Sequence, residues 1–96
     1  MAALKEIGLD TIVVQASGLV AADLDGEKVM LSIEKGQYFS LNGVAGRIWE
    51  LLEKPLTVRE ITTELQKEYA VEAETCQEEV LAFLKELYDQ GVVDIT

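Results

Sequence analysis

The fold is decided by residues 29–52, which read VMLSIEKGQYFSLNGVAGRIWELL. The first five residues alternate in the two-residue period of a strand, Glu34–Gly36 supplies a turn, and Gln37–Leu41 resumes the strand pattern. From Asn42 the apolar residues change to the three- and four-residue spacing of a helix. That helix is predicted to end at Lys54, because the proline that follows disfavours the α conformation in the residue before it. The stretch therefore predicts a β-hairpin that leads directly into a helix.

Upstream residues extend this hairpin to a three-stranded antiparallel meander. Leu19–Leu24 is the additional strand, and Asp25-Gly26 after it is the dipeptide that best tolerates positive φ in a tight hairpin turn. Thr11–Ala16 contains a β-branched run and is predicted to form a short strand or an extended arm. At 96 residues the chain has room for one core, so we expect a single domain over residues 1–96, with residues 1–18 as the arm or strand.

Downstream residues predict two more helices. Thr57 and Glu60 form a capping box that starts the second helix. The third helix is predicted from about Glu74 to Gln90, and the glycine after it suits the left-handed residue that ends many helices. Val92–Ile95 can then form a short terminal strand. Three strands followed by three helices predict an α+β, winged-helix-like fold.

Composition argues against catalysis by this chain. It contains no histidine and a single cysteine, Cys76, which removes most metal sites and every histidine-activated nucleophile. Acidic residues are plentiful, but runs such as Glu72–Glu79 are typical of solvated helix faces. We therefore expect no catalytic residues, no metal and no cofactor.

The charge also restricts the partners. The formal net charge is −10, from 18 acidic and 8 basic residues, and would repel a phosphate backbone. No apolar run is long enough to cross a bilayer, and Met1–Asp10 lacks the basic start and apolar block of a signal peptide. We expect a cytoplasmic protein that binds neither nucleic acid nor membranes.

Apolar, cap and turn residues follow one another along residues 29–93 in a distinctive order and spacing. The members of this series are Gly36–Asn42, Ile48-Trp49, Leu52, Pro55, Thr57, Leu65, Tyr69, Val71, Val80, Phe83-Leu84, Leu87 and Gly91-Val92. The series resembles the PqqD-like family, the peptide recognition elements of ribosomally made, modified peptides. Within that family it is most similar to the stand-alone proteins of lasso-peptide pathways.

The resemblance implies a winged-helix-like domain without activity of its own. It implies that the leader segment of a precursor peptide docks as an added strand beside the third strand, in a groove walled by the third helix. The implied partners are the leader peptide and the leader peptidase and cyclase of the same pathway. Related domains serve other modified-peptide pathways and pyrroloquinoline quinone formation, and these pathways remain alternatives.

Elementary physics supports a peptide site at the same place. The last strand of a meander has an open row of N–H and C=O groups, which a partner strand can satisfy. Pockets for its side chains are expected where the third helix meets that strand. The candidate peptide-binding residues are the backbone of Gln37, Tyr38, Phe39 and Ser40 and the side chains of Val80, Phe83, Leu84 and Leu87.

Several of these residues have a second interpretation. Tyr38 and Phe39 point to opposite faces of the sheet, and the sequence does not say which ring is available to a ligand. Phe83 and Leu84 are equally well explained as core residues. Trp49, which lies among apolar neighbours in a helix, and Cys76, at a buried-face position near a helix start, are interpreted as core residues.

The strongest functional alternative is a winged-helix regulator that binds DNA, which the order of the second and third helices would suggest by itself. A DNA reader needs basic residues on its recognition helix. The predicted third helix carries Lys85 as its only cation, which favours the peptide-binding interpretation. The acidic surface is explained by solubility or, alternatively, by a preference for positively charged leaders or enzymes.

Overall fold

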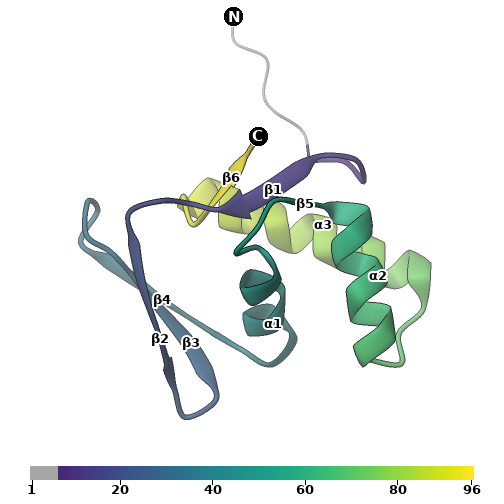
Figure 1. The fold of residues 1–96 in the computed structure, drawn as a ribbon, viewed down its shortest axis with the longest axis horizontal. Coiled ribbons are helices and arrows are strands. Elements are labelled where there is room, and N and C mark those ends of the chain that lie inside the picture. The colour runs from purple at the N-terminus through teal and green to yellow at the C-terminus, as the bar shows by residue number, and fades with distance from the viewer. Residues whose placement is uncertain (1–6) are drawn as a thin grey trace, which may run out of the picture.

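The computed structural model describes residues 7–96, apart from the side chain of Asn42. The first six residues of the predicted N-terminal arm lie outside the described residues. The described chain forms two small sheets and three helices (Figure 1), which confirms the α+β class and the order of strands before helices.

The predicted meander is one of the two sheets. It consists of β2 (Leu19–Leu24), β3 (Glu27–Ser32) and β4 (Gln37–Asn42), paired antiparallel in that order. The turn between β2 and β3 has φ of 49° at Asp25 and 82° at Gly26, the positive values that a two-residue hairpin turn requires. The hairpin signals in the sequence were therefore sufficient to place all three strands.

The meander turns only one of its faces towards the core. Met30 is fully buried and Ser32 is 7% exposed, whereas Leu31 between them is 44% exposed. Register places Val20, Leu31 and Tyr38 in one row across the three strands, and all three side chains are exposed. This row gives the outer face of the sheet an apolar strip that is open to solvent.

A second sheet closes the opposite side of the molecule. Its strands are β1 (Ile12–Gln15), β5 (Leu56–Thr57) and β6 (Val93–Ile95), all antiparallel in the order β5-β1-β6. The residues predicted as a strand or an arm thus form a central strand, and the predicted terminal strand is confirmed. The two-residue β5 was not predicted, because its residues carry the start signal of the next helix.

The three helices are α1 (Gly43–Leu51), α2 (Val58–Glu68) and α3 (Ala73–Gln90). The capping box predicted at the start of α2 is formed, with the Thr57 hydroxyl accepting a hydrogen bond from the Glu60 N–H and the Glu60 carboxylate accepting one from the Thr57 N–H. The predicted end of α3 is also confirmed, since Gly91 is left-handed with φ of 81°.

Helix α1 is shorter than predicted, because it ends at Leu51 and not at Lys54. Gln15 of strand β1 donates hydrogen bonds to two carbonyl groups at this end of the helix. The Gln15 side chain donates to the Trp49 carbonyl at 2.8 Å, and the Gln15 N–H donates to the Leu52 carbonyl at 2.9 Å. A tertiary contact with a distant strand thus ends the helix before the proline does.

The core lies between the three helices and the β5-β1-β6 sheet. Trp49 is 4% exposed and its indole N–H donates to the Val92 carbonyl at 3.3 Å, so its interpretation as a core residue is confirmed. Cys76, 6% exposed, is also part of this core. None of the described helices is long and apolar enough to cross a membrane.

Candidate peptide-binding site

The edge of β4 is the first part of the candidate site. Within the described residues β4 is the last strand of its sheet and pairs with β3 alone. The N–H and C=O groups along its other side therefore have no strand partner there. Such an edge is a template for the main chain of an extended peptide.

The side chains of β4 divide between the two faces of the sheet. Phe39 pairs with buried Met30 and packs against the core, half-buried. Tyr38 pairs with Leu31 on the outer face and is 72% exposed. The structure thus assigns Phe39 to the core side and Tyr38 to the solvent side. Which of them contacts a ligand at the edge stays a prediction.

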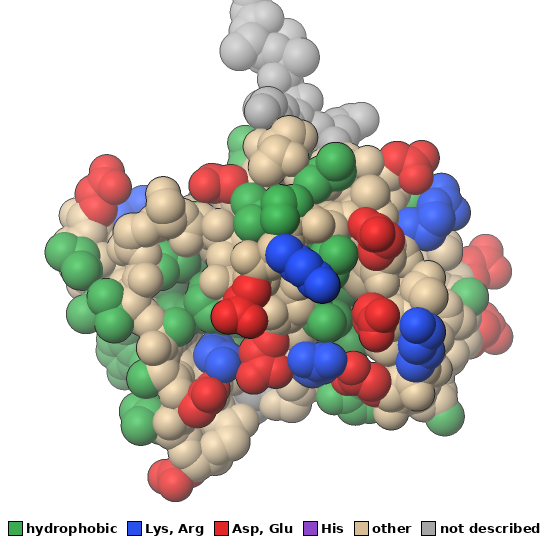
Figure 2. Space-filling model, in the orientation of Figure 1, with side chains coloured by type: hydrophobic (Ala, Val, Ile, Leu, Met, Phe, Trp, Pro, Cys, Tyr) green, Lys and Arg blue, Asp and Glu red, His purple; other side chains and the backbone are tan. Residues whose placement is uncertain are grey.

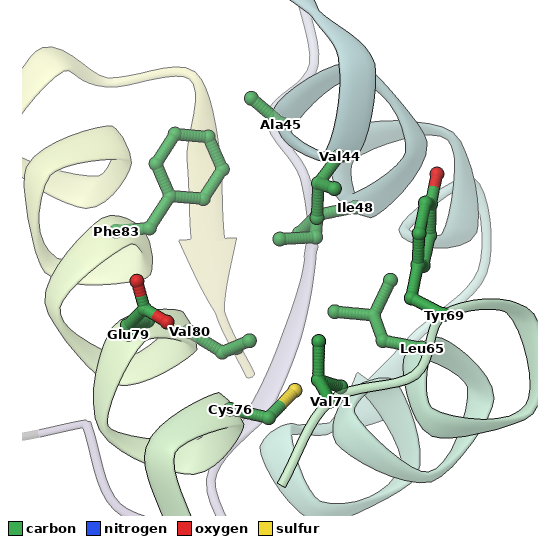
Figure 3. Close-up of a pocket in the computed structure, with 10 residues that line it drawn as sticks. All are labelled: Val44, Ala45, Ile48, Leu65, Tyr69, Val71, Cys76, Glu79, Val80 and Phe83. Atoms are coloured by element: carbon green, nitrogen blue, oxygen red, sulfur yellow. The ribbon is translucent and has the colours of Figure 1, made fainter.

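The second part of the site is a cavity of about 350 Å³ between α1, α2 and α3. Figure 3 shows Val44 and Ile48 of α1 on the side of this cavity opposite Phe83 of α3. Leu65 of α2 and Tyr69, at the C-terminal end of α2, lie on that side as well. Its lining is almost entirely apolar. The lining residues are Val44, Ala45, Ile48, Leu65, Tyr69, Val71, Cys76, Glu79, Val80 and Phe83.

Strand β4 and one wall of this cavity are adjacent in the chain. Asn42 ends β4, and Val44, two residues later, lines the cavity. Gly43 makes the corner with φ of 56°, and at Gly46 a Cβ atom would lie 3.2 Å from the Leu41 carbonyl oxygen. The two glycines thus allow the chain to turn sharply and α1 to pack closely on the end of β4.

One ion pair joins α1 to α2, two walls of the cavity, and two further pairs extend from it. Arg47 of α1 lies 2.6 Å from the Glu68 carboxylate of α2 and 3.4 Å from the Glu50 carboxylate. The hydrogen bond with Arg47 lowers the pKa of Glu68, and the same contact raises the pKa of Arg47. Lys28 of β3 pairs with Glu50 at 3.1 Å. Charges of both signs accordingly mix across the face that carries α1 and α2 (Figure 2).

The predicted α3 residues fall into two groups. Val80 and Phe83 line the cavity, and Phe83 is half-buried there. Leu84 is fully buried and Leu87 is 5% exposed, and neither lines the cavity. The structure places these two leucines in the core, and their contribution to a peptide groove stays a prediction.

Sequence reasoning missed most of the cavity lining. The missed residues include Val44, Ile48, Leu65 and Tyr69, whose helical spacing alone indicates burial in the core. A gap between three helices depends on how the helices are set relative to one another. Periodicity does not contain that information.

The site has little chemistry of its own. Burial, and secondarily the charge of Glu79, raises the pKa of the Cys76 thiol, which disfavours the reactive thiolate. The described residues contain no group of three or more histidine, cysteine or acidic side chains that could hold a metal ion. The arrangement is suited to binding an extended, partly apolar ligand.

Comparison with known proteins identifies the family to which this fold belongs. A sequence model of the family described as coenzyme PQQ synthesis protein D (PqqD) matches residues 27–93, which is most of the chain. The chain belongs to the PqqD family. The match begins at β3 and ends in β6, so it includes both β4 and the helices around the cavity. No curated protein matches the chain.

Two solved structures resemble this PqqD-family fold. One is described as TbiB1 in complex with the TbiA(beta) leader peptide; it has a TM-score of 0.79 and 32% identity, and the match covers 84% of this chain and 94% of that one. The other is described as lasso peptide synthetase B1 complexed with the leader peptide. Its TM-score is 0.76 at 23% identity, over 85% of this chain and 96% of that one, a likeness of fold.

Proposed function

We propose that this protein binds the leader segment of a ribosomally made precursor peptide and presents it to partner enzymes. The leader adds a strand along the outer edge of β4 and places an apolar side chain in the cavity between the three helices. Main-chain pairing then supplies attachment that tolerates many sequences, and the cavity supplies choice.

The observation that carries this proposal is that an unpaired strand edge and an apolar cavity adjoin at the turn made by Gly43. The edge alone would attract any strand, and the cavity alone would accept any small apolar molecule. Their adjacency at the corner made by Gly43 fits an extended peptide with an apolar anchor. A mostly apolar lining with few polar groups is typical of ligand-binding sites.

The family match and the similarity to TbiB1 support the same role, because that neighbour was solved with a leader peptide. We assign the chain to lasso-peptide biosynthesis in the cytoplasm, with a leader peptidase and a cyclase as its enzyme partners. Leader binding in another modified-peptide pathway, or in formation of pyrroloquinoline quinone, is the second candidate, and the description of the family favours it. A short precursor gene beside genes for a protease and a cyclase would distinguish the two.

The binding test uses the TbiA(beta) leader and any short precursor encoded next to the gene. Titration calorimetry should detect binding, and NMR should place the largest shifts in β4 amides and in Val44 and Phe83. Methylation of alternate backbone nitrogens of the bound peptide should weaken binding, because alternate N–H groups of a strand face the same neighbour. Loss of affinity without this alternation would argue against strand addition.

Two valine variants provide a matched control. Val44 lines the cavity and is 43% exposed, whereas Val20 is 54% exposed on the outer face of β2. Val44→Glu should weaken binding by about tenfold or more, since a carboxylate would be desolvated by the apolar anchor, and Val20→Glu should not. Equal affinity of both variants would place the site elsewhere.

A second readout concerns catalysis. Mass spectrometry after long incubation with the protein alone should recover the peptide intact. Cleavage or cyclisation by the purified chain would show that it is an enzyme.

A further inference from the structure

Glu79 is the one charged residue in the lining of the cavity, where the other nine residues are uncharged. It lies on α3 between Cys76 and Phe83, and Figure 3 shows its carboxylate on the same wall as the Phe83 ring. A carboxylate in this position is not needed to fill the cavity. Its chemistry therefore matters for what the cavity accepts.

Glu79 has no cation to neutralise it among the described residues, where every ion pair involves other carboxylates. The positions three and four residues away on α3, where a helical ion pair would form, hold Thr75, Cys76, Ala82 and Phe83. Lys85, six residues along, lies on a different side of the helix. The Glu79 carboxylate is therefore available to a ligand.

Other acidic residues on α3 add to the negative electrostatic potential around the Glu79 carboxylate. Helix α3 carries five acidic residues and one basic residue, a net charge of −4 over 18 residues. The field of Glu79 contributes, after burial, to the raised pKa of the Cys76 thiol inside the cavity. Glu79 is exposed, and a peptide that fills the cavity would displace some of the water that screens its charge.

We propose that Glu79 makes the cavity selective for leader peptides that carry a lysine or arginine within two residues of their apolar anchor. The inference rests on the proposed function and specifies its substrate. In an extended peptide, neighbouring side chains alternate in direction and next-nearest ones lie about 7 Å apart on one side. A cation at either spacing can reach the carboxylate on the α3 wall while the anchor occupies the cavity. An acidic residue there is repelled.

Selection from a displayed library of random peptides tests this preference without knowledge of the natural leader. The library is selected on the natural protein, on Glu79→Gln and on Glu78→Gln. Glu78 is the matched control, because it is an exposed glutamate on the same helix that does not line the cavity. Circular dichroism confirms that each variant is folded.

Peptides selected on the natural protein should share an apolar anchor with lysine or arginine at a fixed offset. Glu79→Gln should keep the anchor and lose the cation, and Glu78→Gln should keep both. In titrations with one selected peptide, replacing its cation by glutamine should cost about three- to tenfold in affinity to the natural protein and nothing to Glu79→Gln.

Two results would overturn the inference and spare the proposed function. One is an enriched anchor without a preferred cation, and the other is a cation preference that survives in Glu79→Gln. Failure to enrich any peptide on the natural protein would instead refute peptide binding itself, and the inference with it.

Discussion

The β2-β3-β4 sheet and the rest of the molecule bury their apolar residues to very different extents. Among residues 7–96 fourteen apolar residues are buried, and Met30 alone of these comes from this sheet. Of the eight large apolar residues that are exposed in the same range, by contrast, five lie in its strands or turns: Val20, Leu24, Leu31, Ile33 and Tyr38. The helices and the β5-β1-β6 sheet thus form the core, and the meander is a platform attached to it.

This difference has a consequence for binding. A three-stranded sheet with one buried face is near the lower limit of independent stability. We expect the meander to open locally more readily than α2 and α3, since few buried contacts restrain it. An added peptide strand along β4 would stabilise the part of the molecule that has the least support of its own.

The largest effect is expected from Trp49→Ala in the core. Trp49 is 4% exposed and its indole N–H is bonded to the Val92 carbonyl, so truncation should cost about 3–5 kcal/mol of unfolding free energy. Tyr38→Ala, an aromatic truncation on the platform at a residue 72% exposed, should cost no more than about 0.5 kcal/mol. Denaturant titrations measure both, and similar losses would erase the distinction between the two regions.

The next effect tests how firmly the platform is attached. Met30→Ala should cost about 2–5 kcal/mol, because Met30 is the one fully buried side chain that joins the sheet to the core. Hydrogen exchange should show the loss concentrated in β2, β3 and β4, with α2 and α3 still protected. Uniform loss of protection would mean that the sheet and the helices unfold as one unit.

The two regions also differed in how much the sequence revealed. Turns such as Asp25-Gly26, and the capping box of Thr57 and Glu60, are local signals, and they placed the meander and α2 correctly. The end of α1 depends on hydrogen bonds from Gln15, which is far away in the chain, and it was misplaced. Local sequence signals predict where an element starts. They do not predict which distant residues it packs against.

The candidate site divides in the same way. Its strand edge followed from the order of the three strands, and Val80 and Phe83 followed from the apolar face of α3. Leu84 belongs to the same periodic pattern and yet is fully buried. Residues from α1 and α2 that complete the cavity could be found only once the angles between the helices were known.

A smaller effect is expected at the start of α2. Thr57→Ala removes the hydroxyl that accepts the Glu60 N–H at 3.1 Å and should cost about 0.5–2 kcal/mol. Thr63→Ala is the control, since the Thr63 hydroxyl donates to the Arg59 carbonyl within the helix and caps nothing. Equal effects of the two variants in thermal unfolding would show that the capping box does not contribute.

The smallest effect is expected on the outer face of the platform, and two valines in strands make the comparison clean. Val20 of β2 is 54% exposed and Val93 of β6 is 1% exposed. Valine-to-threonine substitution keeps the shape of the side chain and adds one hydroxyl group. At Val93 that hydroxyl is desolvated in the core, at a cost of about 1–3 kcal/mol. At Val20 it is hydrated in both the folded and the unfolded chain, so the unfolding free energy should change by less than about 0.5 kcal/mol.

Denaturant titrations of the two variants, at several protein concentrations, measure both costs. If Val20→Thr were as costly as Val93→Thr, the outer face would be buried in solution, and the contrast between platform and core would be wrong.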